Sequence, residues 1–345
     1  MPAGTAPGGP REAQFPGAGV TEMSKGAPTV LSAMGQAKYE TASDGHPARV
    51  APTWTEEKLA IVACYLHGFA VACKSHPRGW YALDIFAGGG LNISATTGAE
   101  IPGSALIALE AGPPLARTVV LCERGARALP ALRHRVAPHG DRARVFAGDA
   151  NAEIGDMLAV LARDAPAFAF LDPEGSELVW ATVRAIAEHH PKPYRKVEQL
   201  ILLPTDMGFV RTLPLAKDLG EAAAAKITAM YGHDRWRAIY KRRRAGSINA
   251  EAARTEYVRL YAQGLRDLGY LHVQERQITK EGAGGRAGSP MYFLMHASDH
   301  PVGETIMAHC FDKKHIRPGE QLGQEGLFHV PVAPRRRRVS DADQH

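Results

Sequence analysis

The amino-acid sequence predicts an α/β fold, in which helices cover both faces of a largely parallel sheet. Stretches with the continuous apolar character of buried strands alternate with stretches whose apolar residues recur every three or four positions. Three glycines in a row follow the first of these strands, and four of the strands end in an acidic residue. Together these observations indicate a sheet whose carboxyl edge binds a ligand.

The composition is that of a globular protein. The chain has 345 residues, enough for one large domain or two small ones, and 45% of them are hydrophobic. It contains no run of about 18 apolar residues, and its Pro/Gly/Ala-rich start lacks the apolar stretch of a signal peptide. The four cysteines show no Cys-x-x-Cys spacing, so no metal site is expected. These features predict a protein of the reduced cytoplasm with no membrane association.

Large apolar residues are distributed unevenly, and their distribution divides the chain into five segments. Residues 1–50 carry few of them and show no periodicity, so they are expected to form a disordered leader. The ordered core is expected over 51–203. A basic helical insertion over 204–253 and the C-terminal part of the core over 254–315 follow, and 316–345 is expected to be a flexible tail.

The individual elements follow from periodicity. A helix is predicted to begin at Thr53, because Thr53 and Glu56 have the spacing of a capping box and an amphipathic pattern follows them. Later strands are predicted at 80–86, 118–122, 143–147, 167–171 and 197–203, and helices near 104–111, 125–136, 151–163 and 177–189. Two last strands, 270–279 and 291–297, flank a glycine-rich loop and are expected to pair antiparallel.

The first candidate site is the glycine-rich turn after the first predicted strand of the sheet. Asp84, Phe86, Gly88, Gly89 and Gly90 belong to the pattern Asp-x-Phe-x-Gly-x-Gly, which differs from the dinucleotide-binding Gly-x-Gly-x-x-Gly. Glycine lets the backbone turn sharply and approach a ligand, because it has no side chain. The Asp84 carboxylate precedes the turn and can accept a hydrogen bond from an ammonium or an amide. A tight turn without a ligand also fits the glycines alone.

Acids at the ends of the next strands extend this site. Glu123 ends the second strand, where it can bind both hydroxyls of a ribose or act as a helix cap. Asp149, followed by Ala150, ends the third strand and can accept from the exocyclic amine of adenine or cap a helix. Asp172 ends the fourth strand at the crevice where open sheets bind ligands.

A ribose acid, an adenine acid and an acid near an ammonium fit S-adenosylmethionine as the cofactor. No Lys-Ser/Thr follows the glycines, which argues against a nucleoside triphosphate. The combination of Asp-x-Phe-Ala-Gly-x-Gly with Glu123, Gly148-Asp149 and Asp172-Pro173 resembles the class I methyltransferases. This resemblance implies a seven-stranded Rossmann-like sheet whose last strand is antiparallel, which agrees with the expected pair of strands near the C-terminus.

A longer set of motifs resembles the three-Cys-motif partner proteins (TcmP), over residues 53 to 315. The motifs are Trp54-x-x-x-Lys58-Leu59, Asp84 to Gly90, Pro102 to Leu109, Gly148-Asp149-Ala-Asn151, Leu171-Asp-Pro-x-Gly175, Met230-Tyr-Gly-x-x-x-Trp236 and Tyr292-Phe-Leu with His300-Pro-x-Gly303 and Met307. The resemblance implies a radical-type, three-cysteine protein as a partner. It names no methyl acceptor, and nothing in the sequence indicates the oligomeric state.

The fourth strand departs from methyltransferases that act on exocyclic amines of bases. Those enzymes often carry Asp-Pro-Pro-Tyr/Phe, whose ring stacks on the base, whereas this chain has Asp172-Pro173-Glu174-Gly175. The change disfavours a base amine as acceptor. It makes Asp172 and Glu174 candidate catalytic proton acceptors for another nucleophile, although a solvated loop position is the alternative for Glu174.

The insertion after the fifth strand holds the basic excess of the protein. Residues 204–250 contain nine Lys and Arg against four acids, a difference of +5, which equals the net charge of the whole chain. Two interpretations stay open: a core-facing stripe under a solvated basic face, or a groove for nucleic acid or another polyanion. The candidate nucleic-acid or partner contacts are Arg235, Trp236, Arg237, Lys241, Arg242, Arg243 and Arg244.

The leading functional hypothesis is therefore an S-adenosylmethionine-dependent methyltransferase with an unidentified acceptor. Two alternatives belong to other classes. One is a non-catalytic accessory module that binds an adenosyl ligand for a partner enzyme, and it predicts cofactor binding without turnover. The other is a nucleic-acid-binding protein, and it predicts binding that weakens steeply with salt.

Overall fold

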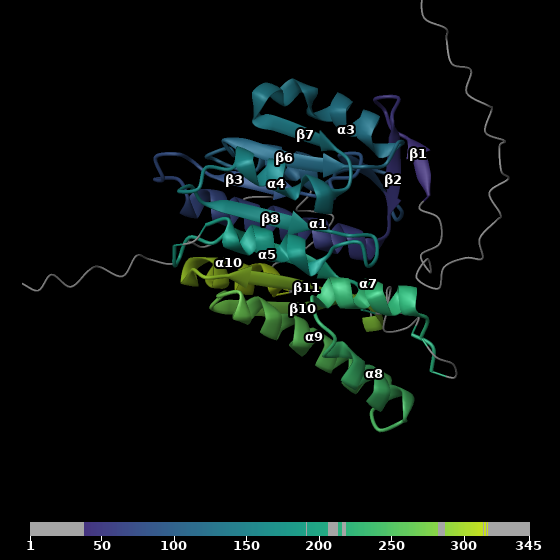
Figure 1. The fold of residues 1–345 in the computed structure, drawn as a ribbon. Coiled ribbons are helices and arrows are strands. Elements are labelled where there is room, and N and C mark those ends of the chain that lie inside the picture. Colours follow the sequence, from purple (N-terminus) through teal and green to yellow (C-terminus); the bar gives the residue numbers. More distant parts are fainter. Residues whose placement is uncertain are drawn as a thin grey trace, which may run out of the picture.

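The computed structural model describes residues 38–190, 192–205, 213–215, 219–281, 287–312, 314 and 316, and Figure 1 shows its fold. Most of the predicted leader, nearly all of the predicted tail and part of the glycine-rich loop near the C-terminus lie outside the described residues. The described strands form a sheet of seven strands and a smaller sheet of four.

The seven-stranded sheet has the order β10-β11-β9-β8-β3-β6-β7. Its strands are β3 (Tyr81–Asp84), β6 (Thr118–Glu123), β7 (Ala143–Ala147), β8 (Ala167–Leu171), β9 (Glu198–Leu203), β10 (His272–Glu281) and β11 (Ala287–Ser298). β11 runs antiparallel to both of its neighbours, while β9, β8, β3, β6 and β7 pair in parallel. This order and orientation confirm the predicted class I methyltransferase sheet, with its last strand antiparallel.

Helices cover both faces of this sheet (Figure 1). One face packs against α1 (Thr53–Ala72), α2 (Ser104–Glu110), α3 (Ala128–Val136) and α10 (Pro301–Phe311). The other face packs against α4 (Ala150–Val160), α5 (Trp180–Glu188), α7 (Glu221–Tyr231) and α9 (Ala250–Asp267). Along the chain, α8 (Trp236–Arg244) lies between α7 and α9. A 3-10 helix, Ala137–Arg142, follows α3. The observed bounds agree with the predicted ones to within a few residues.

The smaller sheet corrects the prediction that residues 1–50 form a disordered leader. Residues 38–50 are described, and they form β1 (Tyr39–Thr41) and most of β2 (Pro47–Ala51). These strands continue through β4 (Leu91–Ser94) to β5 (Glu100–Pro102). Strands of three to five residues with a small apolar cluster leave almost no periodic signal in the sequence, which is why they were not predicted.

The start of α1 also differs from its prediction. Pro52 is the N-cap, and no side chain caps the helix. Thr53 therefore lies inside the helix, and the predicted capping box with Glu56 is wrong. Glu56 instead accepts a hydrogen bond of 2.7 Å from the Ser94 hydroxyl, so the acid joins the helix to β4 of the smaller sheet.

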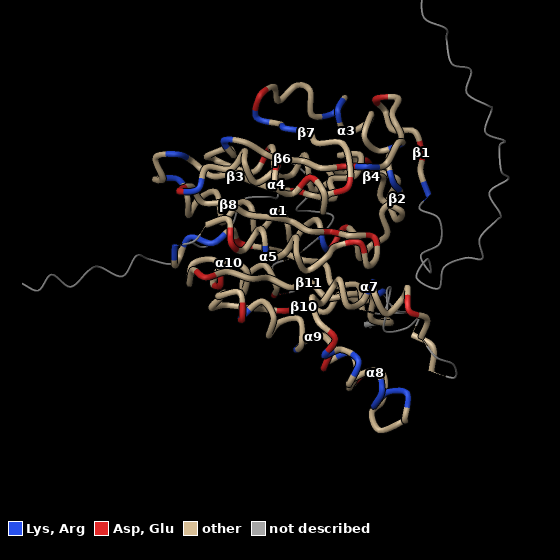
Figure 2. Tube along the Cα trace, in the orientation of Figure 1, with Lys and Arg blue, Asp and Glu red and all other residues tan. Residues whose placement is uncertain are grey.

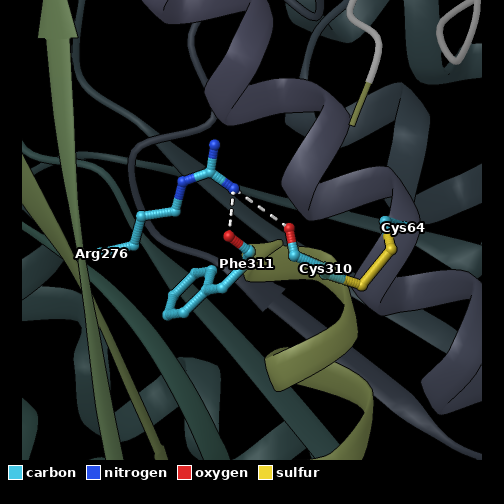
Figure 3. The surroundings of a disulfide bond; sticks show 4 residues. All are labelled: Cys64, Arg276, Cys310 and Phe311. Atoms are coloured by element: carbon cyan, nitrogen blue, oxygen red, sulfur yellow. Dashed lines mark hydrogen bonds between the residues drawn. A yellow bond between two sulfur atoms is a disulfide. The ribbon is translucent and has the colours of Figure 1, made fainter. Parts of the chain in front are cut away.

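A disulfide between Cys64 and Cys310 joins α1 to α10, and Figure 3 shows its surroundings. The two cysteines are 246 positions apart, so their spacing gave no sign of the pairing. Arg276 of β10 donates from Nη1 to the carbonyl oxygens of Cys310 and Phe311, at 3.3 and 2.8 Å, and so holds the end of α10 next to this link. The bond departs from the reduced state on which the cytoplasmic prediction rested. Cys73 and Cys122 are free and buried.

Within the described part of the chain, no helix has the length and apolar character that crossing a bilayer would need. The same residues contain no group of three or more His, Cys, Asp or Glu side chains that could hold a metal ion.

Candidate functional site

A cavity of about 830 Å³ opens at the carboxyl ends of the parallel strands. This is the size range of small-molecule sites. The ends of β3, β6, β7 and β8 form one side of it, and β2, the start of α1 and parts of β10 and β11 form the other. The structure brings nearly all predicted cofactor and catalytic residues to this cavity: Phe86, Gly88, Gly89, Gly90, Glu123, Asp149, Ala150, Asp172 and Glu174. Asp84 is the exception, because it lies beneath the lining.

The glycine turn has the backbone that the sequence predicted. Gly88 and Gly90 have φ values of +60° and +80°, which side-chain-bearing residues rarely adopt. Gly103, at the start of α2, donates its N–H to the Gly90 oxygen at 2.8 Å. A Cβ at Gly103 would lie 2.9 Å from that oxygen, so the loop and α2 approach each other at backbone distance.

Glu123 is joined to the glycine turn by hydrogen bonds. Its Oε2 accepts from the Gly88 N–H at 2.8 Å, and its Oε1 accepts from the Gly125 N–H at 2.5 Å. The carboxylate therefore fixes the loops after β3 and β6 relative to each other. A carboxylate oxygen has two lone pairs, so each oxygen of Glu123 keeps one for a ligand hydroxyl. The ribose role stays a prediction, and the structure adds a positioning role.

Asp84 is 2% exposed. Its Oδ1 accepts from the Phe86 N–H at 3.3 Å, and its Oδ2 has no well-formed hydrogen bond. Burial raises the pKa of Asp84 to about 7, against the Ser104 hydroxyl and the Phe86 N–H, which favour the carboxylate. The nearby carboxylates of Asp172 and Glu123 raise the pKa further. Asp84 thus carries a proton for part of the time near neutral pH, which its sequence position did not reveal.

Asp149 is the N-cap of α4. Its Oδ1 accepts from the backbone N–H of Asn151 at 2.8 Å and from its Nδ2 at 3.0 Å. The helix-cap alternative is therefore realised, and the adenine contact stays a prediction. Asn151 was not predicted as a site residue, yet it joins α4 to the loop before α5. It donates to the Glu177 oxygen at 2.9 Å and accepts from the Thr182 hydroxyl at 2.7 Å.

The two candidate catalytic carboxylates are each engaged by a cation from the opposite side of the cavity. Asp172 pairs with Lys58 of α1, and Glu174 pairs with Arg49 of β2 at 2.8 Å. The Lys58 side chain is only 9% exposed, whereas that of Glu174 is 61% exposed. Neither cation was predicted as a site residue. Lys58 stood in a quoted motif and could have been found, but Arg49 lay in the segment expected to be disordered.

In the basic segment after β9 the structure describes the helices α7 and α8, and no residue of either helix lines the cavity. Trp236 is fully buried and donates from Nε1 to the Thr228 hydroxyl at 3.0 Å. Tyr240 is buried and donates its hydroxyl to the Pro214 oxygen at 2.6 Å. Of the two interpretations left open for this segment, the core-facing stripe is the one that holds for Trp236 and Tyr240, because both rings pack into the core.

The basic side chains of α8 are largely exposed to solvent. In the Cα trace of Figure 2, the basic positions lie together at the end of the molecule where α8 projects. Some pair with nearby acids: Arg242 with Glu256 at 2.8 Å and Arg237 with Asp234 at 2.9 Å. All of α8 is described, and none of its residues lines the cavity. These residues therefore belong to a surface separate from the candidate site.

No family model matches the chain, and no curated protein matches it. Solved structures do match. The O-methyltransferase TomG from Streptomyces achromogenes, in complex with SAM, is 15% identical with a TM-score of 0.38, over 70% of this chain and 78% of that one. An O-methyltransferase from Bacillus cereus, in complex with SAH, is 14% identical with a TM-score of 0.37, over 68% and 80%.

A protein from Legionella pneumophila is 12% identical with a TM-score of 0.42, over 74% of this chain and 92% of that one. These are distant structural similarities, and two of the three matched proteins are described as O-methyltransferases. The resemblance to the three-Cys-motif partner proteins stays a prediction from the motifs.

Proposed function

We propose that the protein binds S-adenosylmethionine in this cavity and transfers its methyl group to an acceptor bound beside it. One observation carries the proposal. The carboxyl ends of β3, β6 and β7 bring the Gly88–Gly90 turn, Glu123 and Asp149 to one cavity, in the order in which a methionine, a ribose and an adenine would need them.

The residues present fit this cofactor. The turn allows close approach of a ligand to backbone, because Gly88 and Gly90 hold conformations reserved for glycine. Glu123 keeps a free lone pair on each oxygen for the two ribose hydroxyls. Asp84 Oδ2 is a buried acceptor with no well-formed hydrogen bond, directly behind the turn.

S-adenosylmethionine would supply an electrophilic methyl group. The chain would bind and orient the cofactor and the acceptor, and it would exclude water. Positioning of this kind accounts for much of the rate in two-substrate reactions. Asp172 and Glu174 are the proton acceptors that we propose for an acceptor that must lose a proton. Lys58 and Arg49 hold these carboxylates at the wall of the cavity, so they act as positioning residues.

Isothermal titration calorimetry tests the binding. We expect a micromolar Kd for S-adenosylmethionine and for S-adenosylhomocysteine, about −8 kcal/mol. Glu123→Ala should weaken binding by roughly 2–4 kcal/mol, because it removes charge-assisted hydrogen bonds to the ligand and to two loop amides. Glu110→Ala is the matched control, since Glu110 is an exposed acid at the end of α2 outside the cavity. Absence of heat at millimolar ligand would contradict the proposal.

A transfer assay tests the chemistry. Tritiated S-adenosylmethionine is incubated with cell extract, and label is measured in the RNA, DNA, protein and small-molecule fractions. With the acceptor fraction in hand, Asp172→Asn or Glu174→Gln should slow transfer about 10²- to 10⁴-fold while cofactor affinity stays nearly unchanged. Cofactor binding with no labelled fraction would instead support the accessory-module alternative.

The resemblance to the three-Cys-motif partner proteins carries a finer proposal, that a radical-type, three-cysteine protein works beside this chain. Co-purification with the product of a neighbouring gene that encodes such a protein would support it. A pair that elutes separately in size-exclusion chromatography, with and without S-adenosylmethionine, would contradict it.

A further inference from the structure

The half of the cavity away from the glycine turn has its own chemical character. It is lined by residues of β2, the start of α1, the tip of β8, and the facing ends of β10 and β11. The tip of β8 borders both halves, and none of the other elements carries the glycine turn, Glu123 or Asp149 of the cofactor half proposed above. In an open α/β sheet, the two halves meet where the chain changes direction between β3 and β8.

Aromatic side chains line the wall of this half. Trp54 and Tyr292 both line the cavity, and the Tyr292 hydroxyl donates to the Trp54 backbone oxygen at 2.8 Å. This bond fixes α1 against β11. Trp54 is partly exposed, whereas Tyr292 is buried, so the Trp54 ring is the larger platform for a flat ligand. Met291 and Pro290 extend the apolar surface beside it.

In this half of the cavity, the positively charged side chains outnumber the negatively charged ones by one. Arg49 and Lys58 pair with Glu174 and Asp172, so these four charges cancel. Lys280 is exposed, and its Nζ lies 5.5 Å from the centre of the Trp54 ring. Among the described residues, Lys280 has no acidic partner. The Lys280 ammonium therefore lies over the Trp54 ring with no acidic partner among the described residues, and both side chains line the cavity.

We propose that this half binds a planar aromatic acceptor with a negatively charged group, the ring against Trp54 and the charge on Lys280. The inference rests on the proposed function, because the ligand is a methyl acceptor only if the protein is a methyltransferase. It adds the chemical class of that acceptor. A sulfonium cation in the other half would add to the positive potential that attracts an anion. The departure from the Asp-Pro-Pro-Tyr/Phe pattern at Asp172–Gly175 agrees with an acceptor other than a base amine.

Two near-isosteric probes isolate the charge. Binding of 4-hydroxybenzoate and of the neutral 4-hydroxybenzamide to the full chain is measured by ligand-observed NMR, with and without S-adenosylhomocysteine. We expect the anion to bind about three- to tenfold more tightly, the size of one partly exposed ion pair. Lys280→Gln should abolish this preference. Lys74→Gln is the matched control, since Lys74 is exposed just beyond the C-terminal end of α1 and does not line the cavity.

The platform is tested separately. Trp54→Leu should weaken both probes together, and Trp54→Phe should restore most of the binding, because a ring remains. Equal affinities of the two probes for the wild type would overturn the proposal, and so would a preference that survives Lys280→Gln. A single-stranded oligonucleotide that binds more tightly and displaces both probes would overturn it in favour of a polynucleotide acceptor.

The two proposals fail in different ways. Probe binding that shows the charge preference, in a protein that gives no heat with S-adenosylmethionine, would uphold the anion site and contradict the proposed function. Tight binding of the cofactor with no preference between the probes would do the opposite.

Discussion

Among the site residues, Asp84 is the one whose ionisation in the fold differs most from the carboxylate that the sequence predicts. Its pKa of about 7 lies above the ordinary aspartate value of 3.8 because the carboxyl group is buried. Between these values the folded state holds a proton that the unfolded state has lost. The contribution of Asp84 to the free energy of unfolding is therefore highest at low pH. It decreases as pH rises through this range and is lowest above pH 7.

Asp84→Asn should remove this dependence, because an amide does not titrate. The free energy of unfolding of the variant relative to wild type should increase by about 2–3 kcal/mol between pH 5 and pH 8. Urea unfolding at the two pH values measures it. Asp141→Asn, at an exposed acid, serves as the control and should show no such change. A difference between Asp84→Asn and wild type that does not vary with pH would show that Asp84 is ionised throughout.

Single residues also show how far the sequence predicts the site. Acids at strand tips could be predicted, because the carboxyl ends of parallel strands meet at one edge of a sheet whatever the details of packing. The ion pairs of Asp172 and Glu174 could not, since Lys58 and Arg49 come from elements distant in sequence. The burial of Trp236 could not be decided either, because its helical spacing fits a core stripe and an exposed groove equally well.

At the scale of elements, Arg135 of α3 holds the β1–β2 hairpin against the glycine turn. Its guanidinium forms a two-pronged pair with Asp44, at 2.7 and 3.1 Å, and donates to the Pro47 oxygen at 3.1 Å. It also donates to the Gly89 oxygen at 2.6 Å. The Arg135 guanidinium lowers the pKa of Asp44 to about 2 through a hydrogen bond. The hairpin is therefore an integral wall of the cavity, which it lines with Tyr39 and Arg49 among others.

Arg135→Met should release the hairpin while leaving the large sheet folded, because it removes every one of these bonds and keeps much of the side-chain volume. Amide exchange in residues 39–51 should accelerate at least about tenfold, the equivalent of about 1.4 kcal/mol of local stability. Cofactor affinity should fall as well, since the glycine turn loses its anchor. Hydrogen-exchange mass spectrometry measures the first effect, and exchange in β3, β6 and β8 reports on the large sheet.

Arg133→Met is the matched control for this prediction, because Arg133 lies on the same helix with its side chain exposed. Unchanged exchange in the hairpin of Arg135→Met would show that strand pairing with β4 holds the hairpin by itself.

The elements that were predicted well share a physical cause. The strands β3, β6, β8 and β9 of the large sheet are buried on both faces, so they appear as continuous apolar runs, and the helices between the strands carry apolar residues at helical spacing. The smaller sheet gives neither signal. Its strands are held by main-chain pairing, by Arg135 and by the hydrogen bond from Ser94 to Glu56, and each of these depends on residues far apart in the chain.

At the scale of the whole molecule, the first and last helices of the described residues cover the same face of the seven-stranded sheet. α1 and α10 pack together there, and the Cys64–Cys310 disulfide joins them across a sequence separation of 246. The C-terminal helix is thus tied to the helix that carries Trp54 and Lys58 into the cavity. The link itself lies on the side of α1 that faces α10, and neither cysteine lines the cavity.

Because the disulfide lies outside the cavity, its reduction should affect the stability of the fold and leave cofactor binding nearly unchanged. A cross-link between distant positions restricts the unfolded chain, so reduction should lower the free energy of unfolding by about 2–5 kcal/mol. Cofactor affinity should change little, because every lining residue keeps its contacts. Guanidinium unfolding and calorimetry, each with and without dithiothreitol, measure the two effects. The Cys64→Ala/Cys310→Ala double variant is the control, since reductant should no longer alter its unfolding. A wild-type midpoint that is insensitive to reductant would show that the two thiols do not form the bond in solution. A large loss of affinity on reduction would instead show that the position of α1 in the cavity depends on the link.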